Sequence, residues 1–460
     1  MLSADHIRAL KQIAGADNCF DDKPHRLAYA YDATRMSLEP DAVVFPRGEN
    51  DVSAILRYCN DKGVPVVPRG AGTGFTGGSL SAKGGVVLAM EKHMNQILEI
   101  DFENMLARVQ PAVINRDLQN AAEELGLFYP PDPASQDYCT IGGNVSENAG
   151  GMRAAKYGIT KDYVLALRAV LPDGSVIRAG KKTIKDVAGY NIAGLIIASE
   201  GTLAVITEIT LTLLPKPRFT ETAMGLFQSV EDAMNATYKT FASGAVPVAM
   251  EFLDNLTIRA VESAYKKGLS VDTGAMLITD VDGNTKDDVE WQLSEIEKVF
   301  KENGATTFYR ARSQSERDAI WFARRNASQS MKFYGPDKMN EDITVPRSAL
   351  PELLRRIKKI GEKYDHNIPC FGHTGDGNVH VNVMTNKQDA VKYHNAEKAI
   401  REIFEAAIDL EGTLSGEHGI GLSKAPFMSM AFTTAELELF RTIKRAIDPK
   451  NILNPDKMGL

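Results

Sequence analysis

Two kinds of hydrophobic pattern divide the sequence near residue 216. Before that point, short apolar runs such as VPVV and VLALRAV alternate with glycine-rich stretches, which predicts a part of the chain rich in strands. Beyond it, segments such as SVEDAMNATYKTFASG carry apolar residues three and four positions apart and alternate with strand-like runs such as AMLITDVDG. Two prolines in LPKPRF punctuate the change, so we expect a domain boundary there.

The same patterns predict individual elements. Residues 51–63 have the spacing of a helix that stops at a glycine, and a buried strand follows them; residues 113–127 form a second amphipathic helix. The run YVLALRAVLPDGSVIRAG predicts two strands joined by an Asp-Gly turn, and GTLAVITEITLTLLP predicts one long strand. In the second part we expect an α+β domain with helices on one face of an antiparallel sheet, followed by a last helix from residue 433.

Length and composition narrow the class of protein. A chain of 460 residues is too long for a single hydrophobic core, so two or three domains are expected. Its 43% apolar and 25% charged residues are ordinary for a soluble globular enzyme. The formal net charge of −7 gives no general attraction for a polyanion, so nucleic-acid binding is not expected.

The sequence also suggests where the protein works. No stretch approaches the roughly 20 apolar residues of a membrane span, and the charged N-terminal residues do not match a signal peptide. The cysteines form no C-x-x-C pair, so neither a disulfide framework nor a zinc ribbon is expected. A cytoplasmic location is the simplest expectation. The cysteines are Cys19, Cys59, Cys139 and Cys370.

A glycine-rich loop follows the first buried strand. In PRGAGTGFTGGS, Gly72, Gly74 and Gly77 match the dinucleotide pattern G-x-G-x-x-G. That pattern needs a helix directly after it, and the following GSLSAKGGVV is too rich in glycine to form one, so an NAD site of the Rossmann type is disfavoured. Two interpretations remain, with similar weight: a plain glycine-rich hairpin, or a loop whose bare N–H groups surround a diphosphate.

Two further glycine-rich segments favour the second interpretation. Residues 130–158 contain two Gly-Gly pairs with asparagines between them, and residues 188–207 end in the run SEGTLAVIT. Three separate segments in one half of the chain therefore offer bare backbone to a large ligand, which is more than turns alone require.

A histidine-rich hairpin marks the second half. In CFGHTGDGNVHVNV, the Asp376-Gly377 dipeptide favours a two-residue type I′ turn, which would place His373 directly opposite His380 on one face of the sheet. Asn382 would share that face. Two imidazoles so placed can bind one ion, although a histidine pair without a further ligand is more often merely hydrogen-bonded.

The run SGEHGIG supplies a third ligand. Glu417 adds a carboxylate, and two histidines with one carboxylate suit zinc, manganese or ferrous iron. No H-E-x-x-H motif occurs, so a protease of the zincin type is not supported.

Taken in order, the glycine-rich segments resemble the FAD-binding domain of the vanillyl-alcohol oxidase and p-cresol methylhydroxylase superfamily. The second-half motifs GHTGDGNVHVNV, SGEHGIG and DPKNILNPDK resemble the FAD-linked 2-hydroxy-acid dehydrogenases of that superfamily, a group that includes D-lactate dehydrogenases, the FAD-linked glycolate oxidase subunit and D-2-hydroxyglutarate dehydrogenase. The resemblance implies an α+β fold: a two-subdomain FAD-binding domain over residues 1–216, an α+β cap domain with an antiparallel sheet over residues 217–410, and a C-terminal segment, residues 411–460, that returns to the FAD domain.

The resemblance also implies which residues contact FAD. Some members of the superfamily attach the flavin to a histidine of the first glycine loop, where this sequence has Thr73, so we expect the FAD to be bound non-covalently. The expected FAD contacts are Pro68, Arg69, Gly70, Ala71, Gly72, Thr73, Gly74, Gly77, Gly78, Ser79, Pro131, Ser135, Gly142, Gly143, Asn144, Asn148, Gly150, Gly151, Gly158, Glu200, Gly201, Leu203, Ile206 and Asn454.

The catalytic set follows from the same resemblance and from the chemistry. His373, His380 and Glu417 match the metal ligands, with zinc as the first choice and manganese or iron as alternatives, and His418 matches the base. For the substrate carboxylate, an arginine gives bidentate recognition. Arg324 matches the substrate arginine of the family. The other candidates for contact with the substrate are Arg325, Lys338 and Asn382.

The expected function is metal-assisted oxidation of a small D-2-hydroxy acid, D-lactate or a similar acid, to the 2-oxo acid by FAD. The sequence lacks a cysteine cluster for an iron–sulfur centre of its own, so the expected electron acceptor is an electron-transferring flavoprotein, an iron–sulfur subunit or a quinone, through which the protein could associate with the inner face of a membrane. Alternatives are a flavin-binding subunit of a larger electron-transfer complex acting on glycolate or D-2-hydroxyglutarate, and a flavin-free metal hydrolase. A homodimer is left open.

Overall fold

The structure, a computed structural model, describes residues 1–34 and 36–460, which divide into two units. The long stretch of the second unit begins after Lys216, within the run LPKPRF that carries the two prolines. The chain returns to the first unit after Gly416, later than the expected residue 410, and a short excursion near residue 150 also belongs to the second unit. The first unit comprises Met1–Gly150, Ile159–Lys216 and Glu417–Leu460; the second comprises Gly151–Gly158 and Pro217–Gly416.

One half of the first unit is a small, mostly parallel sheet covered by helices. The strand order is β1-β2-β4-β3, in which β2, β4 and β3 run parallel. The predicted helix at residues 51–63 is α3, which ends at Gly63 in the left-handed conformation (φ 66°) that glycine adopts readily. The elements are α1 (Ala4–Ala14), β1 (Cys19–Phe20), α2 (Lys23–Ala28), β2 (Ala42–Val44), α3 (Glu49–Lys62), β3 (Val66–Arg69) and β4 (Val86–Ala89).

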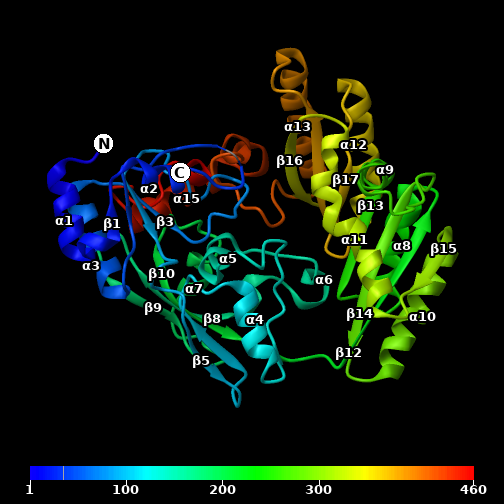
Figure 1. Ribbon diagram of the computed structural model, residues 1–460, viewed down its shortest axis with the longest axis horizontal. Coiled ribbons are helices and arrows are strands. Elements are labelled where there is room, and N and C mark those ends of the chain that lie inside the picture. The colour runs from blue at the N-terminus through cyan, green and yellow to red at the C-terminus, as the bar shows by residue number, and fades with distance from the viewer. Residues whose placement is uncertain (35) are drawn as a thin grey trace. The chain divides into compact units, whose positions relative to one another are not determined.

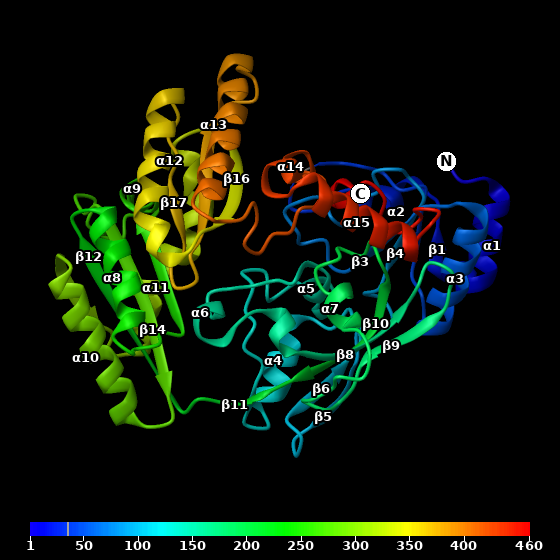
Figure 2. The same cartoon turned by 180° about the vertical axis from the view of Figure 1, so that it is seen from behind.

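The C-terminal segment packs on this half. Figures 1 and 2 both show the red helix α15 (Thr434–Ile447), which follows the short α14 (Met428–Ala431), beside the blue N-terminal elements of the same unit. The backbone of Val66 in β3 pairs with Leu453, and Ile452 and Leu453 are part of the same buried core. The end of the chain thus completes the core that its beginning starts.

The other half of the first unit is a five-stranded antiparallel sheet with the order β5-β6-β10-β8-β9. Its hairpin β8–β9 is the one predicted from the Asp-Gly turn, and β10 is the predicted long strand. The elements are β5 (Ile97–Asp101), β6 (Leu106–Val109), α4 (Asn115–Glu123), β7 (Leu127–Phe128), α5 (Ile141–Glu147), β8 (Val164–Val170), β9 (Val176–Gly180), α7 (Ile192–Ile196), β10 (Val205–Thr212) and β11 (Leu214–Pro215).

The second unit is built on one seven-stranded sheet, and every pair of neighbouring strands is antiparallel, as expected. The order places the two histidine strands, β17 and β18, side by side near one edge. The strands in sheet order are β15 (Ala305–Arg310), β12 (Phe219–Phe227), β14 (Ala275–Gly283), β13 (Ala249–Asp254), β17 (Cys370–His373), β18 (Asn378–Thr385) and β16 (Asp337–Thr344).

The expectation of helices on one face of this sheet is wrong. Every residue of β18 is buried, as is all of β14 except its last residue, so both faces are covered. One group of helices packs with β13 and β14 around Ile278, while another packs on the opposite side. The first group is α9 (Asn255–Tyr265) and α11 (Gln314–Ser330); the second is α8 (Val230–Ala242), α10 (Lys286–Glu302), α12 (Leu350–Tyr364) and α13 (Ala390–Asp409); the short α6 (Ala154–Tyr157) also belongs to this unit.

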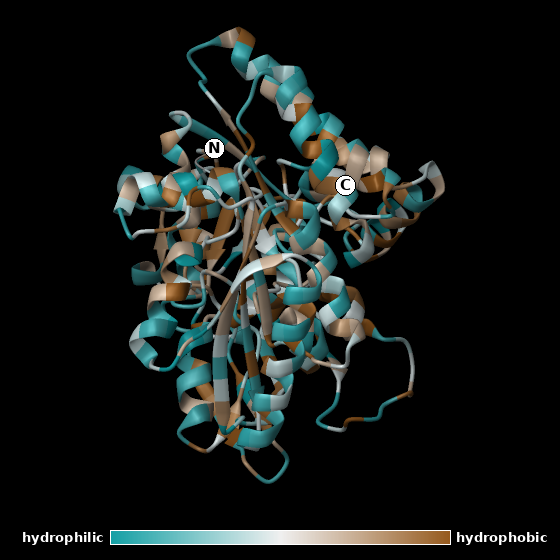
Figure 3. Cartoon of the chain, turned by 90° about the vertical axis from the view of Figure 1, so that its right-hand side faces the viewer, coloured by the Kyte–Doolittle hydropathy of each residue, from teal (hydrophilic) through white to brown (hydrophobic). Residues whose placement is uncertain are grey.

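The helices are amphipathic rather than uniformly apolar. In Figure 3 their ribbons carry hydrophilic and hydrophobic residues interleaved along each helix. Among the described residues, none of the helices combines the length and the apolar character that crossing a membrane requires.

Candidate active site

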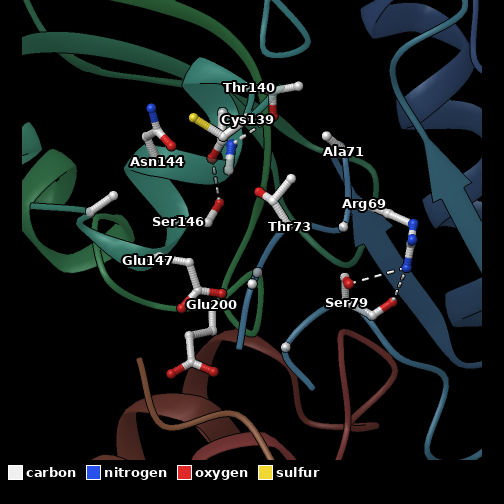
Figure 4. Close-up of a pocket in the computed structure, with 18 of the residues that line it drawn as sticks. Arg69, Ala71, Thr73, Ser79, Cys139, Thr140, Asn144, Ser146, Glu147 and Glu200 are labelled. Atoms are coloured by element: carbon white, nitrogen blue, oxygen red, sulfur yellow. Dashed lines mark hydrogen bonds between the residues drawn. The ribbon is translucent and has the colours of Figure 1, made fainter. Parts of the chain in front are cut away.

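The first unit contains a large cleft formed by the three glycine-rich segments. The empty space at the cleft, including the open solvent at its mouth, is about 1260 Å³, and many of the residues in its wall are glycines or have small side chains (Figure 4). The expected FAD contacts found in its wall are Pro68, Arg69, Gly70, Ala71, Gly72, Thr73, Gly74, Gly78, Ser79, Ser135, Gly142, Gly143, Asn144, Gly150, Glu200, Gly201 and Ile206. Glu417 and His418 also line it.

The first glycine loop folds around a buried arginine instead of opening a helix. No helix begins between β3 and β4, which removes the Rossmann interpretation. The guanidinium of Arg69 donates hydrogen bonds to the backbone oxygen of Tyr31 and to Oγ of Ser79, so it braces the loop from inside. Gly72 is required because a Cβ there would lie 2.1 Å from that guanidinium. The loop backbone is left to face the cleft.

Several expected FAD contacts lie outside the wall. Asn454 is buried and donates hydrogen bonds to the backbone oxygens of Gly78 and Glu200, so it joins two wall segments without lining the cleft. Asn148 ends α5 in the left-handed conformation. The positions that the structure does not place in the wall are Gly77, Pro131, Asn148, Leu203 and Asn454, together with Gly151 and Gly158, which belong to the second unit.

The two hairpin histidines face each other within the second unit. Both side chains are buried, and their Nε2 atoms are 3.3 Å apart with ring planes at 84°. Two nitrogens bound to one tetrahedral ion at about 2.0–2.1 Å would be about 3.3–3.4 Å apart. The separation of His373 and His380 therefore fits an ion held between the rings.

The hairpin reaches this arrangement by a different register from the one expected. The turn spans four residues, 374–377, and Phe371 rather than His373 is the direct partner of His380. A two-residue type I′ turn is therefore wrong. The register differs from the expected one by two residues, and because side chains alternate with a period of two, both histidines remain on the same face.

A buried carboxylate orients His373. Oε1 of Glu251, in β13, lies 2.5 Å from Nδ1 of His373, so that nitrogen donates to the carboxylate and Nε2 is left to act as a ligand. The other oxygen of Glu251 accepts a hydrogen bond from Nε of Arg324. Burial opposes ionisation of Glu251, but the charges of His373 and Arg324 outweigh burial and hold the pKa of its carboxyl below the usual value.

The candidates for contact with the substrate carboxylate differ in burial and in their partners. Arg324 is largely buried and lies over the ring of Phe371, whereas the exposed Arg325 pairs with Asp318. Lys338 is exposed and donates to Oγ of Ser328.

Asn382 is fully buried in β18. Its Nδ2 donates hydrogen bonds to the backbone oxygens of Pro369 and His380. Its Oδ1 is buried with no hydrogen-bond partner among the residues that the structure describes. A buried acceptor in this position is available to a ligand.

Glu417 and His418 are presented by a loop of the first unit. The ring of His418 stacks on Phe75 of the first glycine loop, with ring centroids 5.0 Å apart, and its backbone oxygen accepts a hydrogen bond from Thr76. Both side chains are mostly buried, at 13% exposed for His418 and 14% for Glu417. The base expected from sequence thus lies in the wall of the cleft that the glycine loops form.

Sequence reasoning missed several of these residues. Glu251 has a visible signal, because it is a lone acidic residue in the apolar run VAMEFLD, and a buried charge needs a partner. The other missed residues belong to the cleft wall and carry no such signal: Phe75, Met90, Pro111, Pro133, Ala134, Cys139, Thr140, Ser146, Glu147, Ala149, Ala204 and Val205.

Comparison with known proteins identifies the family of the chain. Residues 216–458 match the family described as FAD linked oxidases, C-terminal domain, and residues 40–180 match the family described as FAD binding domain. The chain belongs to the FAD-linked oxidases. It is an FAD-linked oxidoreductase, and most of the residues in the cleft wall belong to the stretch that matches the FAD binding domain.

Individual relatives within the FAD-linked oxidases extend over the whole chain. The glycolate oxidase subunit GlcD of Bacillus subtilis is 43% identical over 459 residues, which cover 100% of this chain and 97% of that protein. A D-lactate dehydrogenase of Anaerostipes hadrus is 32% identical and covers 98% of this chain and 95% of that protein. The crystal structure of p-cresol methylhydroxylase with substrate bound has the same fold, with a TM-score of 0.82 and 17% identity over 99% of this chain and 96% of that one.

We predict that Glu251→Gln destabilises the protein, because it removes the buried negative charge that faces Arg324 and His373. Breaking a buried ion pair from one side costs about 3–5 kcal/mol of unfolding free energy, which urea unfolding at pH 7 would measure. The folded pKa of Glu251 is lowered, so its charge stabilises the fold fully above the unfolded carboxyl pKa of about 4.3. The difference from wild type should therefore shrink as the pH falls below that value.

The matched control is Glu290→Gln in the same unit. Glu290 pairs with Arg310 at the surface, where it is 66% exposed, so its loss should cost no more than about 1 kcal/mol. Equal losses for the two variants would contradict the role of Glu251.

Proposed function

We propose that the protein uses FAD and a divalent metal ion to oxidise a small D-2-hydroxy acid, D-lactate or a similar acid, to the 2-oxo acid. The observation that carries this proposal is the facing pair His373 and His380, whose Nε2 atoms have the separation of two ligands on one ion while Glu251 fixes the tautomer of His373. A hydrogen bond between the two rings that served only the fold would not need the buried carboxylate of Glu251, which is hydrogen-bonded to both His373 and Arg324.

The chain itself delivers the third ligand. Residues 412–416 are pinned to the edge strand β16: Thr413 pairs with Thr344, and the backbone N–H of Gly416 donates to Oδ2 of Asp342. Asp342 is the direct cross-strand partner of His380. Glu417 follows Gly416, one Cα step of about 3.8 Å further on. We infer that His373, His380 and Glu417 hold the ion, zinc first, with manganese or iron as alternatives.

Each remaining residue has a role set by the needs of the reaction. When bound, FAD supplies the hydride acceptor, and the ion supplies a Lewis acid for the substrate hydroxyl. His418 takes the hydroxyl proton as the C2 hydrogen leaves with its electron pair. Arg324 holds the carboxylate with the N–H groups not used on Glu251, and Oδ1 of Asn382 accepts a hydrogen bond from the substrate.

The electrons then pass to another molecule. The four cysteines are all buried and widely separated in sequence, so the described chain offers no ligand set for a cluster of its own. An electron-transferring flavoprotein, an iron–sulfur subunit or a quinone would serve as acceptor. A second candidate function, a flavin-binding subunit of a larger complex that oxidises glycolate or D-2-hydroxyglutarate, is favoured by the name of the 43% identical relative, a glycolate oxidase subunit.

The flavin should be bound non-covalently, because Thr73 stands where a histidine tether would be needed. We predict a yellow protein that releases all of its flavin into the supernatant on acid or heat precipitation. Absorbance of the supernatant at the flavin bands measures this. Flavin retained in the pellet would contradict the prediction and would direct attention to Cys139, the thiol in the cleft wall.

Two histidine substitutions should distinguish the role of the metal from the role of the base. Anaerobic addition of D-lactate should bleach the flavin of the wild type. In His380→Ala we expect the metal to be lost and the FAD retained, so the substrate fails to bleach the flavin while dithionite still does. In His418→Ala both cofactors should remain, with reduction by substrate slowed by roughly 10²–10⁴, the usual contribution of a positioned base.

The exposed His394 provides the control. His394→Ala should match the wild type in metal content, in FAD content and in the rate of flavin reduction. Full activity of wild type in the presence of chelator, with no stoichiometric metal by elemental analysis, would contradict the metal assignment. Failure of every small 2-hydroxy acid to bleach the flavin would contradict the proposed reaction.

A further inference from the structure

Two glutamates lie close together in the wall of the cleft. Glu147 ends α5 and Glu200 follows α7, and both line the cleft wall (Figure 4). A Cβ added at Gly419 would lie 2.1 Å from Oε2 of Glu147 and 3.1 Å from Oε1 of Glu200, and one added at Gly78 would lie 2.8 Å and 3.7 Å from their other oxygens. The two carboxyl groups therefore lie near each other, and the backbone of Gly78 and of Gly419 lies beside both.

The two carboxyls differ in their partners. Glu200 is 5% exposed, and its two oxygens accept hydrogen bonds from the backbone N–H groups of Ile420 and Gly421, at 2.7 and 2.8 Å. Oε2 of Glu147 is closed off from solvent and has no hydrogen-bond partner among the described residues. Among the described residues, donors that favour the charged form are therefore found on both oxygens of Glu200 but not on Oε2 of Glu147.

The surrounding charges also favour a charged Glu200 and a protonated Glu147. Burial raises the pKa of Glu200, but its backbone N–H donors and the nearby Lys457 and Lys424 oppose that effect. For Glu147, burial, the facing Glu200 and the more distant Asp32 all raise the pKa well above the usual value. Two negative charges so close together, with little solvent to screen them, repel each other, which favours a single proton held by the pair.

We propose that Glu147 and Glu200 share a single proton, carried by Glu147, and that the charged Glu200 thereby anchors the loop at residues 417–421. That loop carries Glu417 and His418, so the pair acts as a positioning device for the metal ligand and the base. Its catalytic consequence rests on the proposed function, whereas its effect on the loop does not. A second negative charge on Glu147 would repel Glu200 and weaken its hold on Ile420 and Gly421.

The experiment uses the FAD-loaded protein and Glu147→Gln, which mimics the protonated acid. A carboxyl whose folded pKa is raised loses stability as the pH rises from about 4.3 toward that folded pKa. The melting temperature of Glu147→Gln should therefore rise relative to wild type across this range, by at least about 2 °C at pH 8, with the difference vanishing toward pH 4. The same change at the exposed Glu103 should give no pH-dependent difference.

Amide exchange provides the readout on the loop itself. Glu200→Gln should lower the protection factors of the Ile420 and Gly421 amides at least tenfold, while Glu147→Gln leaves them as high as in wild type and keeps them high at alkaline pH. A melting difference that does not change with pH, or equal exchange in both variants, would overturn the proposal.

A kinetic measurement connects the pair to catalysis. In wild type the rate of flavin reduction by substrate should fall at alkaline pH, and Glu147→Gln should shift that fall to higher pH. If no hydroxy acid reduces the flavin, the proposed function fails while the melting and exchange results still decide the fate of the glutamate pair.

Discussion

The hydrogen bonds that pin residues 412–416 to the edge strand β16 are the constraint on which the rest of the site depends. The backbone of Gly416 reaches the carboxylate of Asp342 because it has no side chain: a Cβ there would lie 2.1 Å from Nδ2 of Asn378. From that point the chain enters the first unit, where Glu200 holds the backbone of Ile420 and Gly421. The segment between these two sets of hydrogen bonds carries Glu417 and His418, the proposed ligand and base.

The site requires several charged groups to be buried, which lowers the stability of the fold. Glu251 is fully buried and is stabilised by Arg324 and His373, and Glu200 is almost fully buried and is stabilised by two backbone N–H groups. Fully apolar residues of similar volume would make a more stable core at such positions. A protein that keeps these groups uses them for binding or positioning, which is the kind of local conflict with stability that functional sites show.

Much of the fold could be predicted from pattern, since apolar periodicity determines which elements form. The helix at α3, the β8–β9 hairpin and the all-antiparallel sheet of the second unit were predicted and are confirmed. The distribution of helices over both faces of that sheet was not, because a strand buried on both faces, such as β14, loses the alternation that marks a single covered face.

The site was predicted unevenly for physical reasons. The expectation that His373 and His380 share one face of the sheet holds although the expected turn was wrong, because a register shift of two residues leaves each side chain on the same face. The carboxylate behind His373 comes from β13, more than a hundred positions earlier in the chain, and sequence spacing gives no measure of such a contact. Asn454, which was expected to touch FAD, donates hydrogen bonds to the backbone oxygens of Gly78 and Glu200, and the spacing in sequence gives no measure of such contacts.

The central claim is that one ion is held by two hairpin histidines and a glutamate at the start of the returning segment. Anomalous X-ray diffraction on crystals of the metal-loaded protein, recorded on both sides of the absorption edge of the metal found by elemental analysis, tests it most directly. We expect one strong peak within about 2.0–2.2 Å of Nε2 of His373, Nε2 of His380 and a carboxylate oxygen of Glu417. No peak between the rings, or a peak coordinated without Glu417, would contradict it.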